Sequence, residues 1–94
     1  MTMKTKLDRL TMLRNALIER KRIGRRIAEI RKNMVWTDGQ RIKRKGLTQG
    51  ELAERCGLAQ SHIARIEAGK YSVGFDTLQQ IAEALGGVID IVLM

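Results

Sequence analysis

The stretch from Leu47 to Lys70, LTQGELAERCGLAQSHIARIEAGK, constrains the fold more than any other part of this chain. Thr48 followed by Glu51 three residues later is the pattern of a capping box, so it predicts that a helix begins at Thr48. This helix ends at Cys56, because the next residue, Gly57, can adopt the positive φ of a sharp turn at little steric cost. A second helix follows within about three residues, a layout suited to placing that helix in the major groove of DNA.

The second helix, predicted over residues 60–68, has two faces of different character. At about 100° of rotation per residue, Ile63 and Ile66 share one face, which we expect to be buried. Donors and acceptors of the type that reads base edges gather on the exposed side, at Gln60, Ser61, His62 and Arg65. A Gln side chain can bond adenine through two atoms and an Arg side chain can do the same with guanine. The face therefore predicts DNA base recognition.

The segment resembles the Xre family of helix-turn-helix regulators, which includes the phage Cro and repressor domains. The resemblance covers about residues 23–85, with one interruption, and rests on the runs LTQ, ELA, CGLAQS, RIEAGK and TLQQIAEALG between Leu47 and Gly86. It implies a mostly α, four- to five-helix lambda-repressor-like domain. Two positions depart from the family pattern, since Ala59 gives the second helix no side-chain N-cap and Val73 stands where Pro is common.

Carried over residue by residue, the resemblance implies roles for individual side chains. Gln60, Ser61 and Arg65 match base-reading positions. Gln49 would contact a phosphate and buttress Gln60, and Lys70 would contact the DNA backbone. Glu67 matches an acidic position that pairs with an arginine of the first family helix, here Arg31, and this pair is interpreted as structural.

Charge is divided unevenly along the chain. Residues 1–47 hold 15 Lys and Arg against 4 Asp and Glu, whereas residues 48–94 hold 3 against 6, within a net charge of +8. The two-helix segment lies mostly in the acidic half, so attraction for phosphate must come mainly from the N-terminal half.

Composition excludes several classes of protein. Ninety-four residues allow one compact domain. A single cysteine, Cys56, excludes an intrachain disulfide framework, and with one histidine, His62, we expect no metal site, no cofactor and no enzyme activity. Cys56 is interpreted as buried filler and His62 as a groove-facing or solvated side chain. No apolar run approaches the ~18 residues of a membrane span, so a cytoplasmic protein without membrane contact is expected.

Two basic segments precede the two-helix motif. Residues 1–21 are predicted as a basic amphipathic helical extension with Leu10, Leu13 and Leu17 on one face. It could be an arm over DNA, a dimer contact or a partner-binding helix; the alternative, of about equal weight, is a helix packed on its own domain. Residues 22–33 continue in helical period, and whether the two helices join is left open by Gly24, a weak break.

The interruption of the family pattern spans residues 34–46. The runs 34–37 and 40–43 favour β-structure and flank Asp38-Gly39, a type I′ turn signal, which predicts a small hairpin. Its cations are expected to contact the DNA backbone, at Arg41, Lys43, Arg44 and Lys45. The alternatives are a disordered basic loop, or one more helical turn followed by coil.

The C-terminal part is predicted as a helix over residues 75–85 and a β-strand over residues 87–94. The strand is apolar and β-branched, with dimer contacts expected from Val88, Ile89, Ile91, Val92 and Leu93. Pairing with the same strand of a second copy is favoured over augmentation of a partner's sheet or packing on the hairpin of the same chain. Such a strand also looks like that of the HipB and HigA antitoxins of this family.

Two classes of function follow from the sequence. The leading hypothesis is a homodimeric transcriptional regulator that binds specific sequences of double-stranded DNA. Residues 22–86 would form its DNA-binding domain, and its simplest form is a repressor. An antitoxin with a cognate toxin partner is a more specific version. The alternative is a protein-interaction or coactivator scaffold with non-specific nucleic-acid affinity.

Overall fold

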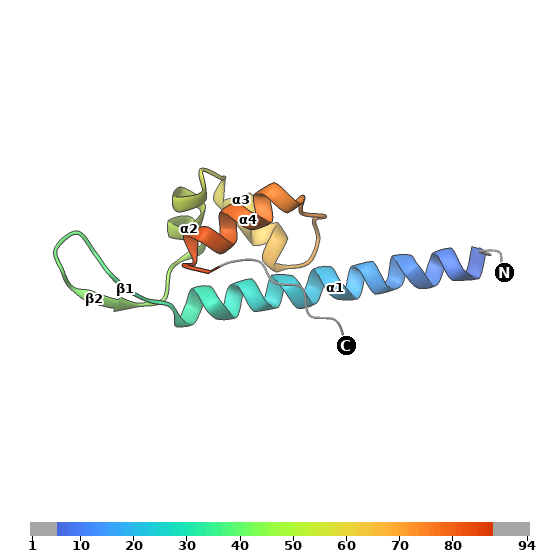
Figure 1. Ribbon diagram of the computed structural model, residues 1–94, viewed down its shortest axis with the longest axis horizontal. Coiled ribbons are helices and arrows are strands. Elements are labelled where there is room, and N and C mark those ends of the chain that lie inside the picture. Colours follow the sequence, from blue (N-terminus) through green and yellow to red (C-terminus); the bar gives the residue numbers. More distant parts are fainter. Residues whose placement is uncertain (1–5, 88–94) are drawn as a thin grey trace.

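The computed structural model describes residues 6–87, with side chains from residue 9 onward. Its elements are α1 (Lys6–Asn33), β1 (Val35–Thr37), β2 (Lys43–Lys45), α2 (Gln49–Cys56), α3 (Gln60–Glu67) and α4 (Phe75–Ala84). Helices α2 to α4 form a bundle against the C-terminal half of α1, while the hairpin and the N-terminal half of α1 project from it in opposite directions (Figure 1). The mostly helical class and the presence of a hairpin were predicted correctly.

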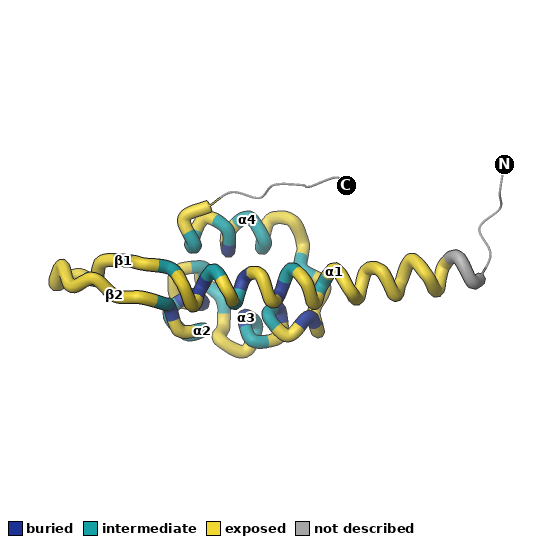
Figure 2. Tube along the Cα trace, turned by 90° about the horizontal axis from the view of Figure 1, so that it is seen from below, coloured by how far each residue is buried: buried dark blue, intermediate teal, exposed yellow. Residues whose placement is uncertain are grey.

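A single core joins the four helices. Each helix contributes apolar side chains that are at most 6% exposed, namely Ile27 from α1, Leu52 and Ala53 from α2, Ile63 and Ile66 from α3 and Ile81 from α4. These buried residues lie where the C-terminal half of α1 crosses the bundle (Figure 2). The inward face predicted for α3 is therefore confirmed, and three of the base-reading candidates, Gln60, Ser61 and Arg65, are exposed.

Helix α1 runs without a break through Gly24, which resolves the question that the sequence left open. An ideal Cβ at Gly24 would lie 2.5 Å from the carbonyl oxygens of Ile66 and Glu67, so any side chain there would collide with the end of α3. Gly69 makes the reciprocal approach, because a Cβ there would lie 2.8 Å from the Cα of Lys21. The two glycines allow α1 and the C-terminal end of α3 to cross at close backbone distance.

The start of α2 has the predicted capping box. The Thr48 hydroxyl accepts from the Glu51 N–H at 3.0 Å, and the Glu51 carboxylate accepts from the Thr48 N–H at 2.9 Å. The hydrogen bond from the Thr48 backbone lowers the pKa of Glu51. Gly57 ends the helix in the left-handed region with φ 69°, as expected. Ala59 precedes α3 without a side-chain cap, so α3 is the less strongly capped of the two helices.

The hairpin is real, but its predicted turn is wrong. β1 and β2 pair antiparallel with Trp36 opposite Arg44, and β2 begins only at Lys43. The loop closes with an Arg41 N–H to Asp38 carbonyl bond of 3.0 Å, and the positive φ falls on Arg41, at 63°. This is a type I turn followed by a left-handed residue instead of a two-residue type I′ turn. The Asp38 carboxylate explains the longer loop, since it accepts from the N–H groups of Gln40 and Ile42 at 2.9 and 3.0 Å.

The N-terminal half of α1 does not pack on its own domain. Every side chain from residue 9 to residue 19 is exposed, and this part of the helix extends beyond the bundle (Figure 2). The alternative of packing on the same domain is therefore wrong for these residues. The C-terminal strand predicted over residues 87–94 lies outside the described residues, except for Gly87.

Candidate nucleic-acid interface

Helix α3 presents an exposed polar face because its apolar face is fixed in the core. Ile63 and Ile66 are 0% and 2% exposed. The predicted base-reading side chains Gln60, Ser61 and Arg65 are all exposed. Because burial of Ile63 and Ile66 fixes the rotation of α3 about its axis, these three side chains point toward solvent.

Tyr71, in the loop after α3, contacts two of the candidate residues. Its ring meets the His62 ring edge to face, with centroids 4.7 Å apart, and the Arg65 guanidinium carbon lies 5.8 Å from the Tyr71 ring centre. Cation–π contacts of this kind are worth on the order of 0.5–1 kcal/mol at exposed sites. Tyr71 therefore restricts the directions that the Arg65 side chain takes.

His62 differs from its sequence-based interpretation as a groove-facing or solvated side chain. It is half-buried, and its Nε2 atom is buried without a hydrogen-bond partner among the described residues. The Tyr71 ring packs against the imidazole nearly at a right angle and contributes to this burial. His62 thus contributes packing beneath the exposed face, and Gln60, Ser61 and Arg65 make up the face itself.

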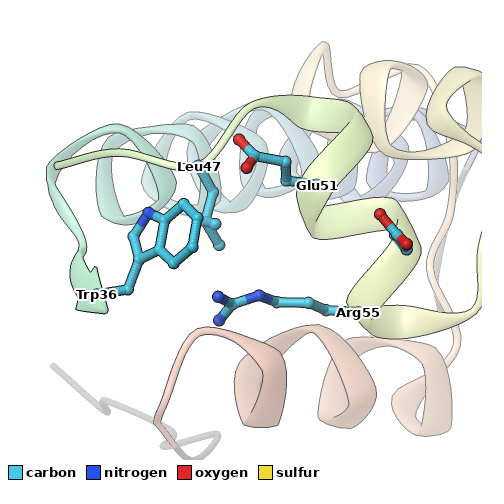
Figure 3. Close-up of a pocket in the computed structure, with 5 residues that line it drawn as sticks. Trp36, Leu47, Glu51 and Arg55 are labelled. Atoms are coloured by element: carbon cyan, nitrogen blue, oxygen red, sulfur yellow. The ribbon is translucent and has the colours of Figure 1, made fainter. Parts of the chain in front are cut away.

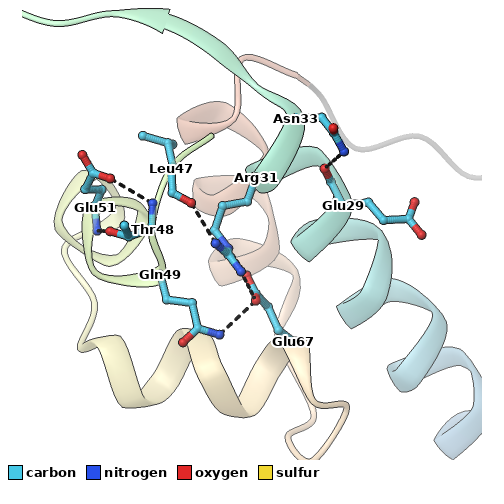
Figure 4. A network of polar contacts seen from close by, with 8 residues as sticks. All are labelled: Glu29, Arg31, Asn33, Leu47, Thr48, Gln49, Glu51 and Glu67. Carbon is cyan, nitrogen blue, oxygen red and sulfur yellow. Dashed lines mark hydrogen bonds and ion pairs between the residues drawn. The ribbon is translucent and has the colours of Figure 1, made fainter. Parts of the chain in front are cut away.

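A buried ion pair fixes the C-terminal end of α3. The Arg31 guanidinium donates to both carboxylate oxygens of Glu67, at 2.7 and 2.8 Å, and to the Leu47 carbonyl at 2.7 Å (Figure 4). The two side chains of the pair are 9% and 7% exposed. A bidentate pair with a further acceptor satisfies most of the polar atoms that burial would otherwise leave unpaired. The pair ties α3 to α1 and to the start of α2.

Gln49 belongs to the same network, and this corrects one of its expected contacts. Its amide nitrogen donates to Glu67 at 3.0 Å (Figure 4), so the side chain supports Glu67 instead of Gln60. Gln60 lies instead over the start of α2, where its amide oxygen is 3.6 Å from an ideal Cβ built on Gly50. The family-based phosphate contact of Gln49 remains a prediction, because that contact needs DNA.

The hairpin carries the four predicted backbone-contacting cations. Arg41, Lys43, Arg44 and Lys45 are all exposed, and the Arg44 side chain bonds Asp38 at 2.8 Å. This bond is the largest cause of the lowered pKa of Asp38, followed by the bond from the Ile42 backbone. The hairpin therefore presents exposed positive charge, and Asp38 is the carboxylate that pairs with Arg44.

Trp36 anchors the hairpin to the bundle. Its indole N–H donates to the Gly46 carbonyl at 2.9 Å, and the Arg55 guanidinium lies 5.1 Å from its ring centre. Trp36 and Arg55 both line an open pocket of about 320 Å³, together with Leu47, Glu51 and Glu54 (Figure 3). The ring therefore serves as a packing anchor between β1 and α2.

A model of the helix-turn-helix family matches residues 40–88, slightly more than half of the chain. The chain belongs to this family. It is 44% identical over 54 residues to an immunity repressor protein of Bacillus phage phi105 and 48% identical over 44 residues to an uncharacterized HTH-type transcriptional regulator of Methanothermobacter thermautotrophicus. A third relative, the uncharacterized HTH-type transcriptional regulator y4dJ of Sinorhizobium fredii, is 36% identical over 56 residues.

These matches cover only parts of the proteins involved. They span 53%, 47% and 58% of this chain, and 38%, 64% and 73% of the three relatives in the same order. The chain therefore spans well under half of the phage repressor. No solved structure matches.

The remaining candidates of the family domain are placed as follows. Lys70 is exposed on the turn after α3, and its N–H donates to the Arg65 carbonyl at 3.0 Å. Cys56 is half-buried, with its sulfur 4.0 Å from the Gln80 carbonyl, and burial raises the pKa of its thiol. Within residues 6–87, no helix is long and apolar enough to cross a membrane.

Sequence reasoning missed Tyr71 and Arg55. The contact of Tyr71 with Arg65 depends on the path of the chain through Gly69. Arg55 meets Trp36 from a different element. Neither contact has a local sequence signal, because each joins a residue of one helix to an aromatic ring whose position depends on the tertiary fold.

Proposed function

We propose that this protein is a sequence-specific, double-stranded DNA-binding regulator of transcription that reads bases with α3. The observation that carries the proposal is the exposed row of Gln60, Ser61 and Arg65 on a helix whose other face is locked in the core. Gln and Arg make bidentate bonds to adenine and guanine, and Ser suits either partner. The names of the relatives, a repressor and two transcriptional regulators, support the same function.

Phosphate binding is assigned to residues around the reading helix. The exposed hairpin supplies Arg41, Lys43, Arg44 and Lys45, and Gln49 and Lys70 lie at the two ends of the two-helix motif. Such contacts set register and orientation but carry no sequence information. The basic N-terminal half thus supplies attraction, while the more acidic helix-turn-helix supplies discrimination.

The proposed active form is a homodimeric repressor. A palindromic operator requires two reading helices about one turn of DNA apart, roughly 34 Å. We assign the dimer contact to the C-terminal residues Val88, Ile89, Ile91, Val92 and Leu93, whose composition favours a strand that needs a partner. Ile91→Asp should shift the sedimentation of the chain from dimer to monomer; an unchanged dimer would place the contact elsewhere.

An antitoxin role is the narrowest form of the proposal. It is supported by the likeness of its C-terminal residues to those of dimeric antitoxins. Expression of the chain should then relieve growth arrest caused by a toxin encoded beside it. Lack of relief would remove this role and leave the DNA-binding proposal intact.

Selection of bound duplexes from a random pool tests the central proposal. A palindromic winner bound by two chains is expected, with lost preference at one base pair in the Arg65→Ala variant. A pool that remains random after selection would favour a protein-interaction scaffold with non-specific affinity, an alternative supported by the acidic balance of residues 48–94.

A further inference from the structure

The N-terminal part of α1 extends past the bundle with its apolar side chains exposed. We call residues 9–19 the arm; every one of its side chains is exposed. It projects past the bundle at the end opposite the hairpin (Figure 1). Most helical stability in proteins comes from packing of an apolar face, and the arm has no such packing from the described part of this chain.

The arm carries an apolar stripe that continues the buried face of α1. Leu10, Leu13 and Leu17 recur at spacings of three and four residues and are 62%, 61% and 49% exposed. Seven residues after Leu17, on the same face of the helix, stands Gly24, which packs against α3. The face that α1 buries inside the bundle thus continues along the arm, interrupted only at the next d position by Arg20.

Charges beside the stripe decide which occupant fits it. If the leucines take the a and d positions of a heptad, then Arg9, Arg14 and Lys21 take the flanking e and g positions. Two copies of the arm paired through this stripe would bring cation against cation whether parallel or antiparallel, because all three flanking charges are positive. Like charges at these positions select against self-pairing and in favour of an oppositely charged helix.

We propose that the arm is a docking surface for an acidic amphipathic helix of another protein. The partner helix would place its own apolar stripe over Leu10, Leu13 and Leu17 and its carboxylates beside Arg9 and Arg14. A DNA backbone would satisfy the cations but leave the three leucines in water. The proposal does not depend on which sequence α3 reads, and a helix docked on the arm leaves the hairpin uncovered (Figure 1).

The test uses a designed peptide of three heptads with Leu at a and d and Glu at e and g. Its binding to the full chain is measured by fluorescence anisotropy at fixed salt, against a matched peptide with Lys at e and g. The acidic peptide should bind at least about 10-fold more tightly, since the charge pairing differs at every flanking position.

Three variants of the chain locate the binding. The triple variant L10Q/L13Q/L17Q should weaken binding of the acidic peptide at least about 10-fold, because Gln keeps helix propensity but removes the apolar contact. The control M12Q/I18Q changes two side chains of similar exposure, 54% and 50%, that lie off the stripe, and should leave binding unchanged. R9E/R14E should reverse the preference between the two peptides.

Several results would overturn the proposal. These are equal binding of the two peptides, no loss in the triple variant, or equal losses in the triple variant and its control. Sedimentation showing that the stripe leucines hold two copies together would assign the face to a second copy. Loss of duplex binding in the triple variant would assign it to DNA, and leucine-dependent binding to phosphatidylserine vesicles without binding of the acidic peptide would assign it to a membrane.

Discussion

Helix α3 and the hairpin are both proposed to contact DNA, but they differ in how they are held. The inner face of α3 is sealed in the core by Ile63 and Ile66, and its end is fixed by the buried Arg31–Glu67 pair. The hairpin is anchored mainly through Trp36 and extends from the bundle with exposed cations. One element is rigidly supported, and the other stands away from the body.

This difference matches the two kinds of interaction that DNA offers. A hydrogen bond to a base edge weakens steeply with distance and angle, so a reading side chain must be held in place. Attraction between a cation and phosphate decays over a screening length of roughly 8–10 Å at physiological salt, so a less constrained ribbon suffices. The molecule therefore places the proposed base-reading side chains on the rigidly held α3 and the proposed phosphate-binding cations on the projecting hairpin.

Glu67→Ala tests whether the buried Arg31–Glu67 pair holds α3 in place. It leaves the Arg31 guanidinium buried without its carboxylate, which costs about 3–5 kcal/mol for a buried pair of this kind. Urea unfolding measures the loss, with the exposed Glu54→Ala as the matched control, for which little change is expected. Similar small effects of the two substitutions would show that the buried pair does not fix α3.

Removing the hairpin charges tests the other side of the comparison. Replacement of Arg41, Lys43, Arg44 and Lys45 by Gln should weaken binding to every duplex and reduce the slope of log affinity against log salt by up to about 3–4, because each phosphate contact contributes roughly 0.9. Fluorescence titrations at several salt concentrations measure both effects. An unchanged slope would remove the hairpin from the interface.

Arg65→Ala should affect specificity instead of general affinity. The expected loss is about 1–3 kcal/mol on the selected operator, with relaxed preference at one base pair. Tyr71→Phe keeps the ring beneath Arg65 and serves as the control that should retain discrimination. An equal loss on all sequences would mean that Arg65 holds phosphate, as the hairpin cations are proposed to do.

Ala59→Ser should increase the difference between α3 and the hairpin, because it adds an N-cap that stabilises α3. The backbone at residue 59 already has the extended conformation of an N-cap, so a serine hydroxyl could accept from the first turn and stabilise the fold by about 0.5–1 kcal/mol. Thr48→Ala, which removes the existing cap of α2, should shift thermal unfolding in the opposite direction. A destabilising serine would contradict this account of the α3 start.

The smallest expected effect is a pH response of the hairpin loop. The bond from Arg44 and the backbone N–H groups lowers the pKa of Asp38, so its contribution to the loop is complete above the ordinary aspartate pKa and disappears as pH falls through the lowered value. The amide resonances of Gln40 and Ile42 should move in that acidic range, while those of α3 stay fixed. Movement at the ordinary aspartate pKa would show that the carboxylate does not hold the loop.

Local signals were sufficient to predict the elements that form the proposed reading site. The Thr48–Glu51 capping box, the glycine turn at Gly57 and the spacing of Ile63 and Ile66 depend on residues within a few positions of one another, and the structure agrees with each. The helix-turn-helix and its exposed face could therefore be predicted from the sequence.

Features that depend on the path of a loop or on residues far apart in the sequence could not be predicted in this way. The Asp38 carboxylate and Arg44 select a longer hairpin loop than Asp38-Gly39 alone indicates. Gly24 reads as a weak helix break, but it is a contact point whose partner, the end of α3, lies more than 40 residues away in the sequence. Tyr71 reads as a loop residue until the fold brings its ring to Arg65.

The central claim is that α3 distinguishes one DNA sequence from another, and a competition titration tests it most directly. The intact chain is bound to its selected operator at fixed salt and displaced by operator or by random duplex of equal length. Recognition by Gln60, Ser61 and Arg65 predicts a preference for the operator of roughly 10³-fold or more. Affinities that agree within a few-fold would contradict base reading by this helix.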